Sequence, residues 1–585
     1  MIAVTKDQLL AVLVVITAGM IFAAPHGLLG LSLASDDGVI HYTYFVSFRD
    51  QVLGGEFYPR WLINQNAGLG SPAFYYYPPL AYYFTLVFSP LPVSELQQLG
   101  LAVGATVVLS GVAAFLWLVQ TTPPRAAAVA ALMYMILPYR TLDIFDRGAF
   151  AELFTFIWMP LILFFISRFV RGSFISAAGI AITVALLSLS HLLTTMMFIP
   201  FACAYAAFEV VQFRMKWRGL WIFCALGVGF GLAGVYILPA MMSRDLVSME
   251  GMIQGHGYYA NSFLTSRLRI SGSLKYFHMT YQVALLALLL FLAARRSTAG
   301  YLRQQFFFWA ACFGAALLMT FSVSRPIWEM LTPLQWVQFP WRFHTVICVA
   351  LAAMLGIAVS RMVKPQTTTA ALCLVCMVIV GIICINDLAR KTIREINKPV
   401  TEIGNYEQKM RFIRRLEDSA AYWPRTVPAG VADLENLLDR VPKQNDVAAK
   451  AYVATGDATV TVERWSPRSI AFNVDTSDPA AVVIGQLYFP GWTAVSKRGD
   501  DETILPVSSD PTTGLVCLSI PPGRQSVTLR LEMLESERLG WASTLFSFMV
   551  LGSFLFYTFF RRRERRQEPA RERSAVSFRE EICNQ

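Results

Sequence analysis

Two adjacent carboxylates, Asp36 and Asp37, directly follow the first long apolar stretch of the chain. A carboxylate can act as the general base that takes the proton from a reacting hydroxyl group. Glu152, at the start of another apolar stretch, is the third candidate catalytic residue. Ionisable groups at the edge of a bilayer are costly unless they have a function or a partner, so these three residues predict a reaction site at a membrane surface.

Helix capping is the alternative explanation of the same carboxylates. An Asp can accept hydrogen bonds from the first backbone N–H groups of a helix, and a Glu in the first turn is favoured by the helix dipole. If a helix begins at the acidic pair, Asp37 and His41 share one face, while Asp36 caps the N-terminus. We therefore expect one aspartate to cap the helix and the other to be the base.

A second group of candidates would bind the substrates, with Arg147 near a phosphate and Asp146 or Glu152 near the acceptor or a divalent cation. Guanidinium groups bind phosphate through paired, charge-assisted hydrogen bonds. The predicted substrate-binding residues are His41, Arg60, Arg140, Asp146, Arg147, His191, Arg267, Arg269 and Arg342.

Structural explanations compete for several of these residues. Asp143 and Arg147, four residues apart in one short connection, could simply pair with each other. His191 between two apolar stretches is typical of a residue at a helix end, and Arg342 could extend toward lipid headgroups. Arg267 and Arg269 lie in a basic external loop, against the positive-inside trend, which a polyanionic acceptor would explain.

The composition places the candidates in a membrane. Of the 585 residues, 55% are hydrophobic and 15% are charged, and the mean hydropathy is +0.49, which is too apolar for an ordinary soluble protein. The net charge of +10 comes from Lys and Arg clusters between apolar runs, so it indicates membrane topology and argues against nucleic-acid binding. Most of the nine cysteines lie inside apolar runs, which argues against a disulfide framework.

Apolar runs of about 20 residues predict membrane-spanning helices. We expect about twelve, near residues 8–24, 97–119, 124–139, 151–169, 174–191, 194–212, 219–239, 281–294, 304–322, 342–360, 367–385 and 538–560. The basic residues in the short loops then fall on one side, which places both termini in the cytoplasm. We expect the first span to be an uncleaved anchor, because its removal would detach the acidic pair from the membrane.

The predicted fold class is a polytopic α-helical membrane protein with an external, β-sandwich-like C-terminal domain. The transmembrane domain covers residues 1–385 and has a large first external loop at 25–96. An external soluble domain covers 386–535 and is β-rich from about 459, where short alternating segments are separated by turn residues. The last transmembrane helix covers 536–560, and 561–585 is a basic cytoplasmic tail.

Several separate patterns resemble one family. They are Asp36-Asp37 with Gly55-Glu56-Phe57-Tyr58-Pro59-Arg60-Trp61, Arg147-Gly148-Ala149-Phe150-Ala151-Glu152, Ser190-His191-Leu192, Gln338-Phe339-Pro340-Trp341-Arg342-Phe343 and Tyr488-Phe489-Pro490-Gly491-Trp492. Together they resemble the bacterial YfhO-like and 6-pyruvoyl-tetrahydropterin synthase-related membrane proteins, relatives of the GT-C glycosyltransferases. The resemblance covers most of the chain, although the tight His-x-His metal motif of the soluble pterin enzyme is not present in the sequence.

The resemblance implies a GT-C-like fold in the bacterial inner membrane and transfer of a sugar from a polyprenyl-phosphate carrier. The acceptor would be an external glycan, lipid or polymer of the cell envelope, and inversion at the anomeric carbon is expected. A metal is left open, with Asp37 and Glu152 as candidate oxygen ligands for Mg²⁺ or Mn²⁺. Two alternatives from other classes are a lipid-linked glycan transporter or flippase and a non-catalytic assembly partner that docks an enzyme through its β-rich domain.

Overall fold

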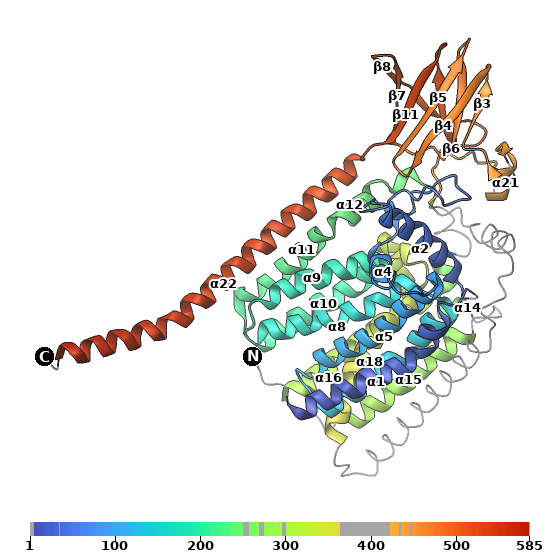
Figure 1. Ribbon diagram of the computed structural model, residues 1–585. Helices are drawn as coiled ribbons and strands as arrows, with labels where there is room; N and C mark the ends of the chain where they lie inside the picture. The colour runs from blue at the N-terminus through green and yellow to red at the C-terminus, as the bar shows by residue number, and fades with distance from the viewer. Residues whose placement is uncertain are drawn as a thin grey trace.

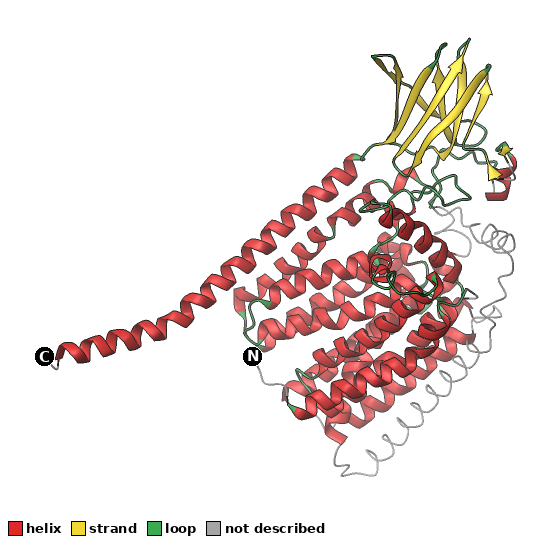
Figure 2. Ribbon diagram, viewed as in Figure 1, coloured by secondary structure: helices red, strands yellow, loops and turns green. Residues whose placement is uncertain are grey.

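The computed structural model describes residues 5–33, 35–249, 257–267, 274–294, 300–362, 422–431, 434–444 and 447–583. Long helices pack side by side into a bundle, and a β-sheet region sits at one end of it (Figures 1 and 2). The long C-terminal helix α22, Glu535–Cys583, begins at the sheets, runs along the bundle and extends beyond it.

Within the described residues, six helical segments are long and apolar enough to cross a membrane. They are α1 (Lys6–Leu29), α5 (Glu95–Leu118), α8 (Phe150–Val170), α10 (Leu192–Gln212), the segment Pro340–Arg361 and Glu535–Phe560 of α22. The segment Pro340–Arg361 joins the short helix η8 (Pro340–Phe343) to α18 (His344–Met362).

Three bent helix pairs raise the number of spans to nine if each pair is one span. They are α6 (Pro124–Ile136) with Pro138–Arg147, Lys216–Leu232 with α12 (Gly234–Met242), and α16 (Gly300–Leu318) with Ser322–Met330. Two further apolar helices, α9 (Ser176–Ser190) and α15 (Leu274–Ala294), are shorter in their apolar part. The predicted span at 367–385 lies outside the described residues, so the expected total of about twelve stays a prediction.

The remaining helices and helical turns that the structure describes are 3 to 16 residues long. They are α2 (Gly38–Leu53), α3 (Ala73–Tyr76), α4 (Leu80–Leu86), α7 (Pro138–Thr141), the π-helical turn η1 (Leu142–Arg147), η2 (Lys216–Gly219), α11 (Leu220–Leu232), η3 (Arg244–Leu246), η5 (Tyr259–Ser262), α14 (Leu264–Arg267), η6 (Ser322–Ser324), α17 (Arg325–Met330), η7 (Thr332–Val337) and α21 (Leu434–Asp439).

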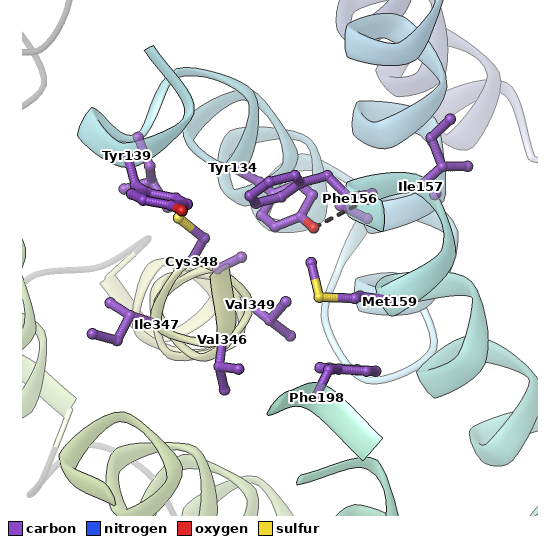
Figure 3. Close-up of a cluster of buried hydrophobic side chains, with 14 of the residues drawn as sticks. Tyr134, Tyr139, Phe156, Ile157, Met159, Phe198, Val346, Ile347, Cys348 and Val349 are labelled. Atoms are coloured by element: carbon purple, nitrogen blue, oxygen red, sulfur yellow. Dashed lines mark hydrogen bonds between the residues drawn. The ribbon is translucent and has the colours of Figure 1, made fainter. Parts of the chain in front are cut away.

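The bundle is built around α18, which packs against α6, α15 and α16. From Val346 to Val359 its residues are all apolar, and a helix that is apolar all round belongs inside a bundle. Figure 3 shows Val346 and Val349 of α18 on the side that faces Met159 of α8 and Phe198 of α10, with Ile347 on the opposite side of the helix. This apolar layer holds the helices that carry the polar residues described below.

The C-terminal region contains two antiparallel sheets, with strand orders β3-β6-β10-β9 and β4-β5-β11-β7-β8, and a small β1-β2 pair. The strands are β1 (Lys443–Gln444), β2 (Val447–Ala448), β3 (Ala451–Thr455), β4 (Ala458–Ser466), β5 (Ser469–Thr476), β6 (Ala480–Leu487), β7 (Trp492–Arg498), β8 (Asp501–Leu505), β9 (Val507–Ser509), β10 (Leu515–Ile520) and β11 (Gln525–Leu531).

The predicted β-rich C-terminal region is confirmed. Its five expected strands correspond to β4, β5, β6, β10 and β11, where alternate side chains such as Val527 and Leu529 are fully buried.

The first loop, predicted as an external connection, is packed between the bundle and the sheets. The Trp61 ring lies 5.7 Å from that of Trp492, and its Nε1–H donates to Gln486 Oε1 over 2.8 Å. The backbone N–H of Leu487 donates to the carbonyl of Leu69 over 2.6 Å. The loop therefore contributes to the core of the β-sheet region as well as to the bundle.

Candidate functional site

The acidic pair is joined to the connection after α7 by backbone hydrogen bonds. The N–H of Asp36 donates to the carbonyl of Asp146 over 3.1 Å, and the N–H of Asp37 donates to the carbonyl of Arg147 over 2.8 Å. Gly148 makes this approach possible because its φ is +64° and a Cβ there would collide with the Ser35 side chain. Two segments far apart in the sequence are therefore fixed against each other.

A buried ion cluster lies directly beyond this backbone contact. Arg147 Nη1 is 3.0 Å from Glu152 Oε2 and also donates to an oxygen of Asp143 and, over 3.1 Å, to the Tyr139 hydroxyl. Tyr139 in turn donates to Glu152 Oε1 over 2.7 Å. Arg147, Asp143 and Glu152 are at most 4% exposed, so their charges depend on one another for stabilisation.

Arg342 brings a second guanidinium group to Glu152 from a distant part of the chain. Its Nε lies 3.9 Å from Glu152 Oε2, and its Nη1 donates to the carbonyl of Val337 over 3.0 Å. Arg147 and Arg342 therefore both approach the same oxygen of Glu152, although they are far apart in the sequence. We call Asp37, Asp143, Arg147, Glu152 and Arg342 the charge cluster.

Asp37 is the half-buried member of the charge cluster. Burial raises the pKa of its carboxyl group, while Arg147 and Arg342 act in the opposite direction and Glu152 adds to the increase. The expectation that Asp36 caps the following helix is wrong: the N-cap of α2 is Asp37, and its side chain makes no capping hydrogen bond. Asp36 is exposed.

His41 lies on α2 one turn after Asp37, as predicted, and is buried. Its Nδ1 is 2.8 Å from the Tyr82 hydroxyl, and the rings of Tyr77 and Phe150 lie within 5.9 Å. Burial, and to a lesser extent the positive charge of Arg147, lower the pKa of His41 to about 3. The imidazole is therefore neutral near pH 7, which suits hydrogen bonding better than binding an anion by charge.

His191 occupies a helix end. It is the N-cap of α10, and its Nδ1 accepts from the backbone N–H of Thr194 over 3.3 Å. The geometry matches the alternative explanation given for this residue. Its predicted contact with substrate stays a prediction.

Two predicted substrate-binding residues, Arg60 and Arg140, lie outside the charge cluster. Arg60 is 1% exposed, and its Nε is 2.9 Å from Glu537 Oε2 at the junction with the β-sheets. Arg140 is fully buried in the bundle, where it donates to Ser110 Oγ over 3.0 Å and lies 4.0 Å from the Phe156 ring. Of the basic external loop, the Arg267 side chain and all of Arg269 lie outside the described residues.

The structure also adds residues that were not predicted to take part. Tyr139 bridges Arg147 and Glu152, and the Trp341 ring lies 4.7 Å from the Arg147 guanidinium carbon. Trp341 is adjacent to the predicted residue Arg342 in the sequence, which was the available signal. Tyr139 gave only a weak signal, because an aromatic residue at a membrane boundary is commonly an interfacial anchor.

No group of three His, Cys, Asp or Glu side chains suited to a metal ion occurs among the residues that the structure describes. The candidate ligand Glu152 faces Arg147 and Arg342, and Asp37 interacts with the same two guanidinium groups. These positively charged surroundings do not fit a divalent cation shared by the two carboxylates.

The sequence matches the family described as "6-pyruvoyl-tetrahydropterin synthase related domain; membrane protein" over residues 74–392. No curated protein matches the chain. Among solved structures, the chain is similar to the arabinofuranosyltransferase AftD from Mycobacteria, with 14% identity and a TM-score of 0.41 over 66% of this chain. It spans 27% of the length of AftD. It is also similar to ArnT from Cupriavidus metallidurans bound to undecaprenyl phosphate, with 13% identity and a TM-score of 0.31 over 62% of this chain and 79% of ArnT.

Proposed function

The chain belongs to the 6-pyruvoyl-tetrahydropterin synthase related family of membrane proteins, and from this premise we propose that it is a membrane glycosyltransferase of the GT-C type. It transfers a sugar from a polyprenyl-phosphate carrier to an external acceptor of the bacterial cell envelope. Both termini are cytoplasmic in this proposal. The end of the bundle that carries α2 and the β-sheets faces outward.

One observation carries the proposal: the backbone of Asp37 is bonded to that of Arg147 over 2.8 Å, and Arg147 and Arg342 lie 3.0 and 3.9 Å from Glu152, in a helical bundle of membrane-span length. A base and two phosphate-binding groups are what transfer from a sugar phosphate requires. A transporter would instead need polar side chains along a path through the bundle, whereas the charge cluster is confined to the end that carries α2.

The reaction is a direct displacement at the anomeric carbon. Asp37 accepts the proton of the acceptor hydroxyl as its oxygen bonds to the anomeric carbon. The bond between that carbon and the phosphate oxygen breaks, and its electron pair leaves with the polyprenyl phosphate. Arg147 and Arg342 stabilise the charge that develops on the phosphate, and the sugar is transferred with inversion.

Glu152 has a positioning role in this scheme. Its carboxylate lies within 3.0 Å of Arg147 and 3.9 Å of Arg342, so it holds both guanidinium groups in one place before the substrate arrives. Because Glu152 is 2% exposed, it is less suited than Asp37 to reach an acceptor hydroxyl.

Turnover by the purified full-length protein with a panel of polyprenyl-phosphate sugars tests the proposal. Asp37→Asn removes the base and is expected to lower the rate at least about 100-fold. The matched control, Asp36→Asn, changes the exposed neighbour and is expected to keep the rate within about threefold. Full turnover by Asp37→Asn would contradict the assignment of the base, and no transfer by the wild-type protein from any donor would contradict the function.

A further inference from the structure

Two buried hydrogen-bond donors beside the charge cluster have no partner among the residues that the structure describes. They are the indole Nε1–H of Trp341 and the Nε–H of Arg342. Trp341 is 3% exposed and Arg342 is 9% exposed. A buried N–H group without an acceptor costs free energy. These two neighbouring N–H groups therefore indicate that a ligand supplies the acceptor.

Both donors belong to groups that lie against the Arg147–Glu152 pair. The guanidinium carbon of Arg147 is 4.7 Å from the centre of the Trp341 ring, which also stacks on Tyr276 at 4.5 Å. Arg342 Nε lies 3.9 Å from Glu152 Oε2, which is too long for a hydrogen bond. The contacts between existing side chains therefore leave both N–H groups unused.

Backbone strain marks the same segment. Gln338 has φ +64° and ψ −45°, an uncommon conformation for a residue other than glycine. Two residues later the chain enters η8, which carries Trp341 and Arg342. The carbonyl of Trp341 is 2.7 Å from His344 Nδ1, and that of Arg342 accepts from Thr345 Oγ1 over 2.9 Å. Strain that the surroundings maintain is typical of ligand-binding segments.

The chemistry of the two donors restricts the ligand. An indole N–H and a guanidinium N–H can only donate, so they bind an acceptor and reject a cation or a second donor. With Arg147 beside them, an anionic oxygen is favoured over a sugar hydroxyl, because charge-assisted hydrogen bonds are the stronger ones.

We propose that Trp341 Nε1–H and Arg342 Nε–H, together with Arg147, bind a phosphate oxygen, and that Trp341 is a specificity-determining residue of this anion site. The identity of the phosphate as the polyprenyl carrier rests on the proposed function, whereas the anion site itself stands on the geometry. The neutral indole N–H fixes the direction of one hydrogen bond to the phosphate oxygen, and the two guanidinium groups supply positive charge.

Binding of undecaprenyl phosphate and of inorganic phosphate to the purified full-length protein tests this inference. Trp341→Phe keeps an aromatic ring for Arg147 and Tyr276 and removes the N–H. It is expected to raise the Kd for both probes about tenfold. The matched control is Trp423→Phe, since Trp423 is also buried with an unpartnered Nε1 among the described residues but lies in the core of the β-sheet region. It is expected to leave both Kd values unchanged.

The wild-type protein distinguishes the two sources of phosphate. Undecaprenyl phosphate bound at least about tenfold more tightly than inorganic phosphate identifies a lipid headgroup site. Equal affinity for the two probes would overturn the lipid assignment. Wild-type affinity in Trp341→Phe for both probes would overturn the role of the indole.

A second variant keeps the inference testable if Trp341→Phe does not fold. Arg342→Lys keeps the positive charge and removes the planar guanidinium donor, and it is expected to weaken phosphate binding to a similar extent. Failure of the inference differs from failure of the proposed function. A protein that binds the lipid phosphate but transfers no sugar contradicts the transferase alone, whereas unchanged binding in both variants contradicts the anion site alone.

Discussion

Among single residues, Glu152 is approached by both guanidinium groups of the charge cluster, and the stability of the cluster depends on it. Its two oxygens contact Arg147 and Tyr139, and Arg342 lies nearby, while the side chain is 2% exposed. Removing one partner from a buried ion pair leaves the other charge without compensation, and this is more harmful than the loss of an exposed pair.

Glu152→Gln is therefore expected to lower the free energy of unfolding by about 3 kcal/mol. Thermal unfolding of the purified protein in detergent measures the effect. The matched control is Glu329→Gln, which breaks the exposed pair between Glu329 and Arg325 at 2.8 Å. It is expected to change stability by less than about 1 kcal/mol. Equal losses in the two variants would contradict the buried pairing.

The pH dependence of the reaction should depend on Asp37. A base must be ionised to accept a proton, and burial raises the pKa of this carboxyl group, so kcat/KM is expected to rise with pH through that raised pKa. Arg147, Arg342 and Glu152 are the charged groups that act on it. His41 is neutral above about pH 3 and does not titrate in this range.

A pH–rate profile checks this prediction in the wild-type protein and in His41→Gln. The midpoint of the acidic limb is expected to be the same in both proteins, even if the absolute rate falls in the variant. A limb that moves or disappears in His41→Gln would assign the titration to the imidazole instead of Asp37.

At the scale of elements, the turn from η1 to α8 holds the site together. Gly148 turns the chain in the left-handed region so that the carbonyls of Asp146 and Arg147 meet the N–H groups of Asp36 and Asp37. A side chain at position 148 would be strained by its φ of +64° and would also displace Ser35.

Gly148→Ala is expected to cost more than about 2 kcal/mol in stability and to lower turnover, because the acidic pair is moved away from Arg147. Gly172→Ala is the control. Gly172 also has a positive φ, +96°, but a Cβ there meets nothing within 4 Å, so the expected loss is about 1 kcal/mol. Thermal unfolding and turnover measure both variants. A Gly148→Ala protein as stable as Gly172→Ala would show that contact with Ser35 is unimportant.

Local patterns were sufficient for much of the fold. The lengths of apolar runs predicted the six described helical segments that are long enough to cross a membrane, and alternation predicted strands such as β5 and β11, because both signals depend on neighbouring residues. The edge strands β8 and β9 are short, and β8 is largely exposed, so alternation gave no signal for them. The α2 cap was assigned to the wrong aspartate because helix boundaries shift by a residue with tertiary contacts.

The candidate site was only partly predictable, because only some of its contacts join residues that are close in the sequence. The pairing of Asp143 with Arg147 follows from their spacing of four residues, and the sequence could suggest it. Arg60 pairs with Glu537, and Arg342 lies near Glu152, which in each case is far away in the sequence. Contacts between distant residues produce no regular spacing in the sequence, so the sequence did not predict them. The proximity of Arg342 to Glu152 is thus a result of the folded bundle.

At the scale of the whole molecule, one carboxylate joins three parts of the chain. Glu537 in the first turn of α22 is 2.9 Å from Arg60 of the first loop and 3.2 Å from Arg468 between β4 and β5. It also accepts a hydrogen bond from the Tyr75 hydroxyl over 2.7 Å. Because Tyr75 precedes Tyr77, whose ring lies 5.9 Å from that of His41, this junction is connected to the end of the bundle that carries Asp37.

Glu537→Gln is expected to detach the first loop from the sheets. The change leaves Arg60, which is 1% exposed, without its counter-charge, at an expected cost of about 3 to 5 kcal/mol. Limited proteolysis should then cleave the chain between residues 54 and 79 faster than in the wild-type protein, because local stability sets access to the backbone. Glu535→Gln changes an exposed residue of the same helical turn and is expected to leave the cleavage rate unchanged. Equal cleavage in all three proteins would mean that apolar packing around Trp61, and not the buried carboxylate, holds the β-sheets to the bundle.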